Sequence, residues 1–334
     1  MLPPPRWLAP SCAALIAAAP ASAASPGATI VSALAGPPKP SFLARVHAGE
    51  IGGVILVGQW RPAEMRSTTA QLHAAGCAIG RPLLVLVDQE GGFARRLTWA
   101  QPDNSEGELG HLGIGETDLE ARQAAVQLRQ TGIDVDLAPV TDTLGPRGFL
   151  RGRSFGSDPA LVGELAVTYV RALQRNGVAA TAKHFPGLGS ATQNTDDSVV
   201  TVWKTELEPF IQAVNAGVKL VMVSSAAYPR LDTSGTPAMF SRPIVTTLLR
   251  QRMGFKGVVV TDALDAPAAA RTPDAPARAL AAGVDLLLYT GSGAARSAYI
   301  ELARDARTSA TVRADIARAV TRIDALERWL GRSC

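Results

Sequence analysis

The sequence predicts an α/β protein, a single domain that closes as a TIM-type (β/α)8 barrel. Short apolar segments rich in β-branched residues recur along the chain, as buried parallel strands require. Helical patterns alternate with them, and several end at a glycine immediately before the next strand. This alternation indicates a parallel sheet covered by helices, and the number of repeats favours closure into a barrel. A doubly wound open sheet is the alternative, although no Gly-x-Gly-x-x-Gly follows the first strand.

The N-terminus has the pattern of a secretory signal peptide over residues 1–24. Arg6 provides a positive charge, an alanine-rich apolar segment follows, and Ala21-Ser22-Ala23 has the small-x-small form of a cleavage site. The apolar segment is too short to span a bilayer, so we expect a secreted protein that leaves the membrane once the signal is removed. A structural N-terminal helix is the alternative. Residues 25–40 are rich in proline, glycine and alanine and are predicted to be a linker or irregular segment, which leaves the barrel domain over residues 41–334.

The predicted elements follow in order from that point. The strands are Gly53–Val57, Leu83–Val87, Val135–Ala138, Val178–Ala182, Lys219–Val223, Gly257–Val260 and Asp285–Leu288. Thr117 with Glu120 reads as a capping box for a helix that runs towards Thr131, and Asp158-Pro159 predicts the start of another that ends before Gly177. Further helices are predicted over Leu207–Ala216, Pro243–Met253, Ala275–Ala282 and residues 311–331.

Composition excludes several classes of function. The 334 residues carry a formal net charge of +4 without a lysine-rich run, so nucleic acid is not an expected partner. None of the four histidines has a partner at metal-ligand spacing, so we expect neither a metal nor another cofactor. No Gly-x-Ser-x-Gly elbow is present, which argues against a serine hydrolase. We expect a monomer.

Two cysteines remain after removal of the signal, Cys77 and Cys334. An even pair in an exported protein can form a disulfide, which here would tie the last residue to an early part of the domain. Two free thiols are the alternative.

Polar side chains follow the ends of several predicted strands. Asp88, the pair Lys183-His184, the pair Ser224-Ser225 and Asp262 all take such places. A barrel gathers the carboxyl ends of its strands at one mouth, so these residues should meet there. Arginines lie in the adjoining loops, at positions 95, 96, 151 and 153. Guanidinium and carboxylate groups hydrogen-bond vicinal hydroxyls well, so the mouth suits a polyhydroxylated substrate such as a sugar.

The carboxylates indicate the chemistry. Asp262 follows a rigid apolar strand and can act as a nucleophile. Glycoside hydrolysis needs a second group to protonate the leaving oxygen. Asp196 and Asp197 are available in the polar loop of residues 190–198, which follows the sharp Pro186-Gly187 turn.

Four segments resemble glycoside hydrolase family 3, in particular its single-domain bacterial β-N-acetylhexosaminidases. They are Val87-Asp88-Gln89-Glu90-Gly91-Gly92 with Arg96, Arg153-Ser154-Phe155-Gly156-Ser157-Asp158-Pro159, Lys183-His184-Phe185-Pro186-Gly187, and Gly254-Phe255-Lys256-Gly257-Val258-Val259-Val260-Thr261-Asp262-Ala263-Leu264. They occur in the right order from about residue 40 to the end. The resemblance implies an exported retaining glycosidase that acts on cell-wall or related β-linked amino sugars.

The resemblance also implies roles for individual residues. Asp262 matches the family's nucleophile. The residues that match those holding the sugar in the −1 subsite are Asp88, Arg96, Arg153, Lys183 and His184. For each of them, a structural ion pair or a helix cap is the alternative role.

The sequence departs from the family where the catalytic acid/base should lie. The resemblance implies an Asp-Ser-His triplet whose histidine is the acid/base, but the aligned positions here are Asn194-Thr195-Asp196. A carboxyl group could serve instead if its pKa were raised, which makes Asp196 the candidate. The alternative is a catalytically impaired relative that binds cell-wall sugar without efficient hydrolysis. Leu188 and Ser225 also stand where the family often has histidine.

Overall fold

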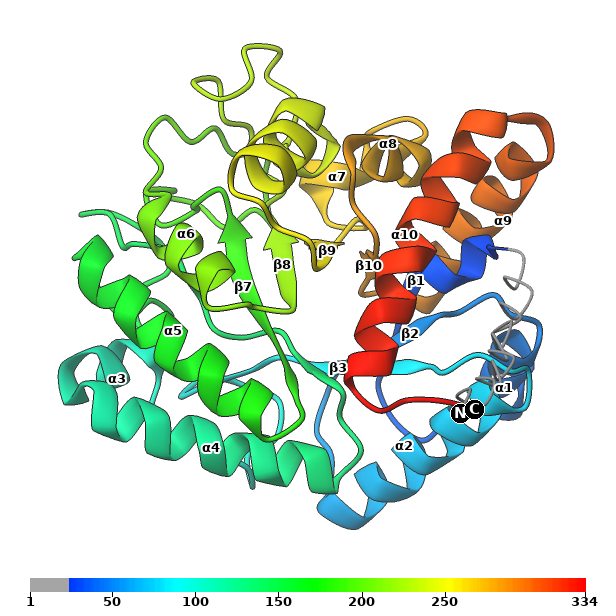
Figure 1. Ribbon diagram of the computed structural model, residues 1–334, viewed down its shortest axis with the longest axis horizontal. Coiled ribbons are helices and arrows are strands. Elements are labelled where there is room, and N and C mark those ends of the chain that lie inside the picture. Colours follow the sequence, from blue (N-terminus) through cyan, green and yellow to red (C-terminus); the bar gives the residue numbers. More distant parts are fainter. Residues whose placement is uncertain (1–23) are drawn as a thin grey trace, which may run out of the picture.

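Eight parallel strands form one nearly closed barrel with helices around it (Figure 1). The structure is a computed structural model that describes residues 24–334, so the signal peptide predicted over residues 1–24 lies outside the described residues but for its last position. The strand order is β10-β1-β2-β3-β6-β7-β8-β9. The two ends of this sheet meet where Thr261 N donates to Leu286 O at 3.0 Å. The predicted barrel is confirmed.

The strands are short, as expected for a barrel of this type. The barrel contains β1 (Ile30–Leu34), β2 (Gly53–Leu56), β3 (Leu84–Val87), β6 (Val135–Asp136), β7 (Ala179–Phe185), β8 (Leu220–Val223), β9 (Val258–Thr261) and β10 (Leu287–Tyr289). A separate antiparallel hairpin follows β3 and consists of β4 (Gln89–Gly91) and β5 (Ala94–Arg95).

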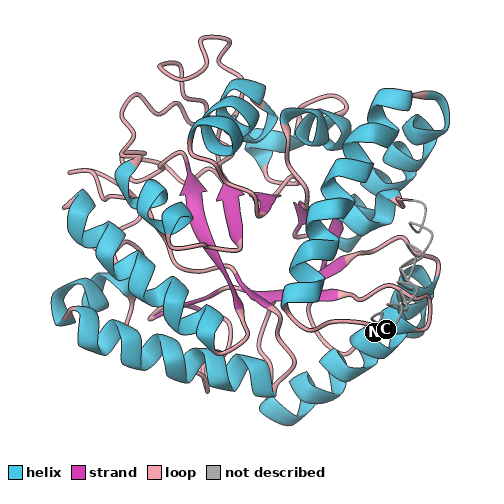
Figure 2. Cartoon of the chain, in the orientation of Figure 1, coloured by secondary structure: helices cyan, strands magenta, loops and turns pink. Residues whose placement is uncertain are grey.

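Helices cover the outside of the barrel (Figure 2). They are α1 (Pro40–His47), α2 (Pro62–Cys77), α3 (Glu106–Leu112), α4 (Ile114–Gln130), α5 (Pro159–Arg175), α6 (Glu208–Asn215), the π-helix η3 (Pro243–Arg252), α7 (Pro267–Ala270), α8 (Ala275–Ala282), α9 (Ser292–Thr308) and α10 (Ala310–Trp329). Two short 3-10 helices, η1 (Pro26–Thr29) and η2 (Ala238–Phe240), complete the set. None of the helices within residues 24–334 is both long and apolar enough to cross a membrane.

Side chains alternate between two apolar clusters along each strand. In β3, Leu84 and Leu86 belong to the cluster that fills the barrel, whereas Val85 and Val87 pack against the helices. Successive residues of a strand point to opposite faces, and both faces are covered here. This explains why the strands are almost continuously apolar, with few polar residues inside them.

The prediction of an irregular segment over residues 25–40 is wrong in its middle part. Ile30–Leu34 forms β1, which pairs with β10 on one side and β2 on the other. The apolar run is short and lies among proline, glycine and alanine, so its local composition resembles a loop. Its place between two other strands, which no local pattern can indicate, makes it the strand that brings the first and last parts of the barrel together.

The capping box predicted at Thr117 is also wrong. Helix α4 begins three residues earlier, at Ile114, and the capping box of this region lies at Ser105 and Glu108 at the start of α3. Glu120 accepts instead from the backbone N–H of Asn104 at 3.1 Å. The start predicted at Asp158-Pro159 is confirmed, since Asp158 caps α5 by accepting from Ala160 N at 3.0 Å.

A disulfide joins Cys77, the last residue of α2, to Cys334 at the end of the chain. The same terminal segment is held by an ion pair between Arg332 Nε and the buried carboxylate of Asp134 at 2.6 Å. His73 Nε2 lies 3.0 Å from the other oxygen of Asp134. The C-terminus is thus fixed to α2 and to the strand region that precedes β6.

Replacing both cysteines by serine is expected to lower the free energy of unfolding by about 2–4 kcal/mol, because a cross-link over a long loop restricts the unfolded chain. The bond closes a loop with a sequence separation of 257 residues. Denaturant unfolding of the wild type and of the double variant, each with and without reductant, measures the effect. The double variant should not respond to reductant. A wild type whose unfolding midpoint is the same in both conditions would contradict the prediction.

Candidate active site

A hollow of about 310 Å³ opens at the carboxyl ends of the barrel strands. Its polar lining consists of Asp88, Glu90, Arg96, Arg153, Lys183, His184, Asn194, Thr195, Asp196, Asp262 and Thr290. Active sites of such barrels lie at this face. A larger hollow of about 910 Å³ lies beside it, between α1 and the start of α9, and Val57 and Thr290 line both. The smaller hollow is the candidate active site because the carboxylates and cations of the strand ends converge there.

Lys183 and His184 lie inside β7 and not beyond its end. The sequence predicts a strand that stops at Ala182, but β7 continues to Phe185 and all seven of its residues are buried. The pairing of β7 with β8 shifts in register between Ala182 and Phe185, which marks a bulge. Bulges re-aim side chains next to active sites, and here both polar side chains reach the hollow.

Lys183 is the centre of a buried ion cluster. Its Nζ lies 2.6 Å from Glu90 Oε1 and 2.9 Å from Asp88 Oδ1. Arg153 binds Glu90 with two parallel hydrogen bonds, both of 2.7 Å. Burial by itself would raise the pKa of Glu90, but the charges of Lys183 and Arg153 outweigh it and lower that pKa to about 2. Burial likewise opposes the charge of Lys183, and the carboxylates of Asp88 and Glu90 nevertheless raise its pKa. Glu90 and Lys183 therefore stay charged at neutral pH.

Glu90→Gln is expected to lower the free energy of unfolding at neutral pH by about 3 kcal/mol, since glutamine leaves Lys183 and Arg153 without the carboxylate between them. The pKa of Glu90 lies below its ordinary value of 4.5. Its ionisation therefore stabilises the fold above about pH 4.5, and that contribution is lost as the pH falls from there towards 2. The difference between wild type and variant should shrink over the same range, because glutamine resembles the protonated acid.

Denaturant unfolding across that pH range measures this difference, with Glu164→Gln, an exposed carboxylate on α5, as the control. The control should differ little from the wild type at every pH. A Glu90→Gln difference that is the same at pH 7 and pH 3 would show that ionisation of Glu90 is not its source.

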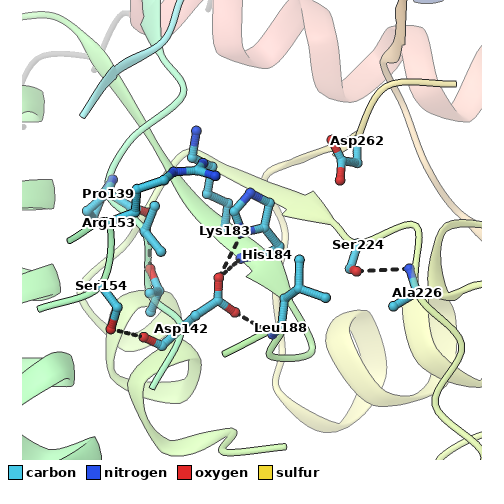
Figure 3. Close-up of polar contacts among 12 residues, drawn as sticks. Pro139, Asp142, Arg153, Ser154, Lys183, His184, Leu188, Ser224, Ala226 and Asp262 are labelled. Atoms are coloured by element: carbon cyan, nitrogen blue, oxygen red, sulfur yellow. Dashed lines mark hydrogen bonds and ion pairs between the residues drawn. The ribbon is translucent and has the colours of Figure 1, made fainter. Parts of the chain in front are cut away.

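Asp142 orients His184 through hydrogen bonds to its ring and its backbone. Its Nδ1 lies 2.7 Å from Asp142 Oδ2, and the same carboxylate accepts the backbone N–H groups of His184 at 2.9 Å and of Leu188 at 2.5 Å. Asp142 is fully buried. A carboxylate at Nδ1 favours the proton on that nitrogen, which leaves Nε2 free to contact a ligand. Figure 3 shows Lys183 and His184 side by side, with Asp142 beneath the histidine.

Asp262 lies across the site from the Lys-His pair (Figure 3). It follows β9 directly and is half-buried. One of its oxygens accepts from Ala263 N at 2.9 Å, and Ser225 Oγ donates to the other at 3.4 Å. These contacts orient the carboxylate of Asp262, which lines the hollow.

The loop of residues 190–198 brings Asp196 to the rim of the same hollow. Thr195 is buried and anchors the loop, while Asn194 accepts from Asp196 N at 3.1 Å and donates to its carboxylate at 3.3 Å. Burial and then the negative charge of Asp262 raise the pKa of Asp196 above that of an ordinary aspartate. Much of the side chain still faces solvent, which screens its interaction with the charge of Asp262.

The structure brings all seven sequence-predicted site residues to one hollow: Asp88, Arg96, Arg153, Lys183, His184, Asp196 and Asp262. Asp197, the other acid considered, is exposed and does not line it. Arg95 pairs with Asp103, and Arg151 binds the carbonyl of Pro146, so neither takes part. Among the residues that the structure describes, no group of three acidic, histidine or cysteine side chains is arranged as a metal site.

Sequence reasoning missed two residues of this site. Glu90 lies two positions after Asp88 in the family motif that follows Val87. Residues two positions apart in an extended segment point to the same face, so this spacing could have indicated that Glu90 and Asp88 lie on one side. Asp142 follows the predicted strand Val135–Ala138 by four residues, within a loop. Its role depends on a contact with His184, 42 positions away, which no local signal reveals.

Residues 36–326 match the family described as glycosyl hydrolase family 3 N-terminal domain. The chain is 34% identical over 288 residues to an uncharacterized secreted glycosyl hydrolase of Arthroderma benhamiae, covering 79% of this chain and 80% of that protein. It is 32% identical over 269 residues to a β-hexosaminidase of Methylobacillus flagellatus, covering 73% and 74% of the two chains.

Two solved structures of β-N-acetylhexosaminidase type are also similar to this chain. The β-N-acetylhexosaminidase of Beutenbergia cavernae superposes with a TM-score of 0.84 at 29% identity, over 92% of this chain and 98% of that one. The β-N-acetylglucosaminidase of a Paenibacillus species gives 0.83 at 29% identity. In that case the match covers 93% of this chain but 62% of the Paenibacillus chain.

Proposed function

Because the chain belongs to glycosyl hydrolase family 3 and is a β-hexosaminidase-like glycosidase, we propose that it releases β-linked N-acetylhexosamine by a retaining mechanism with Asp262 as the nucleophile. The observation that carries the proposal is the hollow itself. A half-buried carboxylate on a strand end, a second carboxyl group with a raised pKa, and a charged cluster suited to hydroxyl groups line one cavity of about 310 Å³.

The first step forms a glycosyl-enzyme. A carboxylate oxygen of Asp262 attacks the anomeric carbon, and the bond from that carbon to the leaving oxygen breaks. The leaving oxygen takes a proton from Asp196, which becomes a carboxylate. Ionised Asp262 and protonated Asp196 are the pair of states that this step needs, and the negative charge of Asp262 itself favours the protonated form of Asp196.

The second step releases the sugar. Asp196, now a carboxylate, takes a proton from a water molecule whose oxygen attacks the anomeric carbon, and the bond to Asp262 breaks. Throughout both steps, Lys183, Arg153 and Asp88 hold the hydroxyl groups of the sugar, and His184 presents its free Nε2. These groups are preorganised by one another before any sugar binds, which reduces the cost of orienting the substrate.

A panel of aryl glycosides tests the function. The wild type should hydrolyse aryl β-N-acetylglucosaminides and prefer them to aryl β-glucosides. A second candidate function, sugar binding without efficient hydrolysis, is favoured by one observation: an aspartate, largely open to solvent, occupies the place where the family resemblance implies a histidine. Binding of N-acetylglucosamine with no turnover of any aryl glycoside would support that second function and refute the first.

We also propose that the protein is exported and acts on cell-wall or related amino-sugar polymers. A relative from Arthroderma benhamiae described as secreted, and the signal pattern of residues 1–24, support export. N-terminal sequencing of protein recovered outside the producing cell should begin near Ala24 or Ser25. Full-length protein that stays inside the cell would contradict this proposal.

A further inference from the structure

Phe93 is an aromatic side chain left in water at the rim of the active site. It is 73% exposed, the highest value among the large exposed hydrophobic residues of the described chain. It also lines the hollow that contains Lys183 and Asp262. Ligand pockets are lined largely by hydrophobic and aromatic side chains, so an aromatic ring that lines the hollow is placed to contact a ligand. The mechanism described above assigns no role to this ring.

The backbone around Phe93 holds it in that position. It lies in the hairpin between β4 and β5, next to Gly91 and Gly92, which adopt positive φ values of 105° and 54°. A Cβ at Gly91 would lie 2.2 Å from the carbonyl oxygen of Asn104, and one at Gly92 would lie 2.5 Å from Ser105 Cβ. The hairpin therefore docks closely on the loop before α3, and only glycine fits at the contact.

The ring itself rests on a second glycine-containing loop. A Cβ at Gly152 would lie 3.0 Å from Phe93 Cε1, so the edge of the ring packs over the backbone just before Arg153. Arg153 is one of the cations bound to Glu90 at the base of the site. The ring is thus supported from below, while most of its surface remains free.

We propose that Phe93 is the platform for the second sugar unit of the substrate, the one on the leaving-group side of the cleaved bond. The inference rests on the proposed function. Lys183, which in the proposed mechanism holds hydroxyl groups of the first sugar, is buried among the residues that line the hollow. The first sugar then occupies the interior of the hollow. A second unit then lies at the rim, where the C–H groups of a pyranose face can stack on the flat ring of Phe93. Phe93 is a specificity-determining residue for substrates longer than a monosaccharide.

Ligand binding to the Asp262→Asn variant, which cannot turn substrate over, tests this placement. Calorimetry would compare N-acetylglucosamine with its β-1,4-linked dimer, with and without the additional change Phe93→Ala. We expect the dimer to lose about tenfold in affinity and the monosaccharide less than about twofold, since only the dimer reaches the ring. Phe93→Tyr should keep the affinity for the dimer. Trp203→Ala removes another exposed aromatic ring that does not line the hollow, and it should change neither ligand.

Other results would overturn the inference. Equal losses for monosaccharide and dimer would place Phe93 against the first sugar. Unchanged affinity for both would show that the ring does not touch the ligand, and an altered mass in solution for Phe93→Ala would assign the ring to a protein contact instead. A different result would contradict the proposed function itself. If Asp262→Asn with Phe93 intact bound neither sugar, both the proposed function and the role of Phe93 would be wrong.

Discussion

Asp262→Asn is expected to abolish glycoside hydrolysis, with kcat/KM lowered by about 10⁴- to 10⁶-fold, the range seen when a catalytic nucleophile or its partner is removed. Asparagine has nearly the same shape as aspartate and can still accept from Ala263 N and contact Ser225 Oγ. Its amide cannot form the ester to the sugar. The loss should therefore appear in the chemical step, while the affinity for the product sugar changes much less.

Steady-state kinetics on an activated aryl β-N-acetylglucosaminide measure this loss. Asp197→Asn is the matched control, because Asp197 is an exposed aspartate that does not line the hollow, and it should retain wild-type activity. A fluorinated N-acetylglucosaminyl fluoride that slows the second step should label the wild type on the peptide containing Asp262. Label on another peptide, or an Asp262→Asn enzyme of wild-type activity, would show that the nucleophile lies elsewhere.

Asp196→Asn is expected to lower kcat/KM by about 10²- to 10⁴-fold for substrates with poor leaving groups, the usual contribution of general acid catalysis. Substrates whose leaving group needs no proton should retain most of their rate in the first step. This contrast follows from the role proposed for Asp196, in which the residue donates a proton and makes no bond to the sugar. A series of aryl glycosides of graded leaving-group pKa measures it, again with Asp197→Asn as the control.

A uniform loss across that series would indicate that Asp196 positions the sugar. No loss at all would show that another group delivers the proton. The pH dependence adds an independent check. An acid must be protonated to act, so the rate falls as the pH rises through the pKa of Asp196, which burial and the charge of Asp262 place above its ordinary value.

The pKa of Asp196 should also depend on the charge of Asp262 in the enzyme without substrate. In Asp262→Asn the negative charge that faces Asp196 is gone, so the pKa of Asp196 should fall while the contribution of burial remains. Carbon-detected NMR titration of the side-chain carboxyls follows this directly. A titration of Asp196 that is identical in both proteins would mean that the two groups do not interact.

The amino-acid sequence by itself determined where the chemistry lies. In a parallel barrel, a polar residue that follows a buried apolar run appears at the carboxyl mouth, so the sequence predicts that Asp88, Lys183 and Asp262 lie close together. The ordered family motifs indicate the chemistry of that mouth, and Asp196 stands where the family resemblance implies a histidine. Local patterns and their order along the chain are enough for this placement, and the sequence contains both in full.

Only the tertiary structure decided which charges meet and which segment completes the barrel. Glu90 binds an arginine 63 positions away, and Asp142 orients a histidine 42 positions away. Segment 30–34 forms a strand because its backbone pairs with β10 on one side and with β2 on the other. The physical reason is the same in each case: the free energy of a buried charge or of an unpaired strand edge is set by what packs against it, and that partner is chosen by the fold and not by the neighbouring residues.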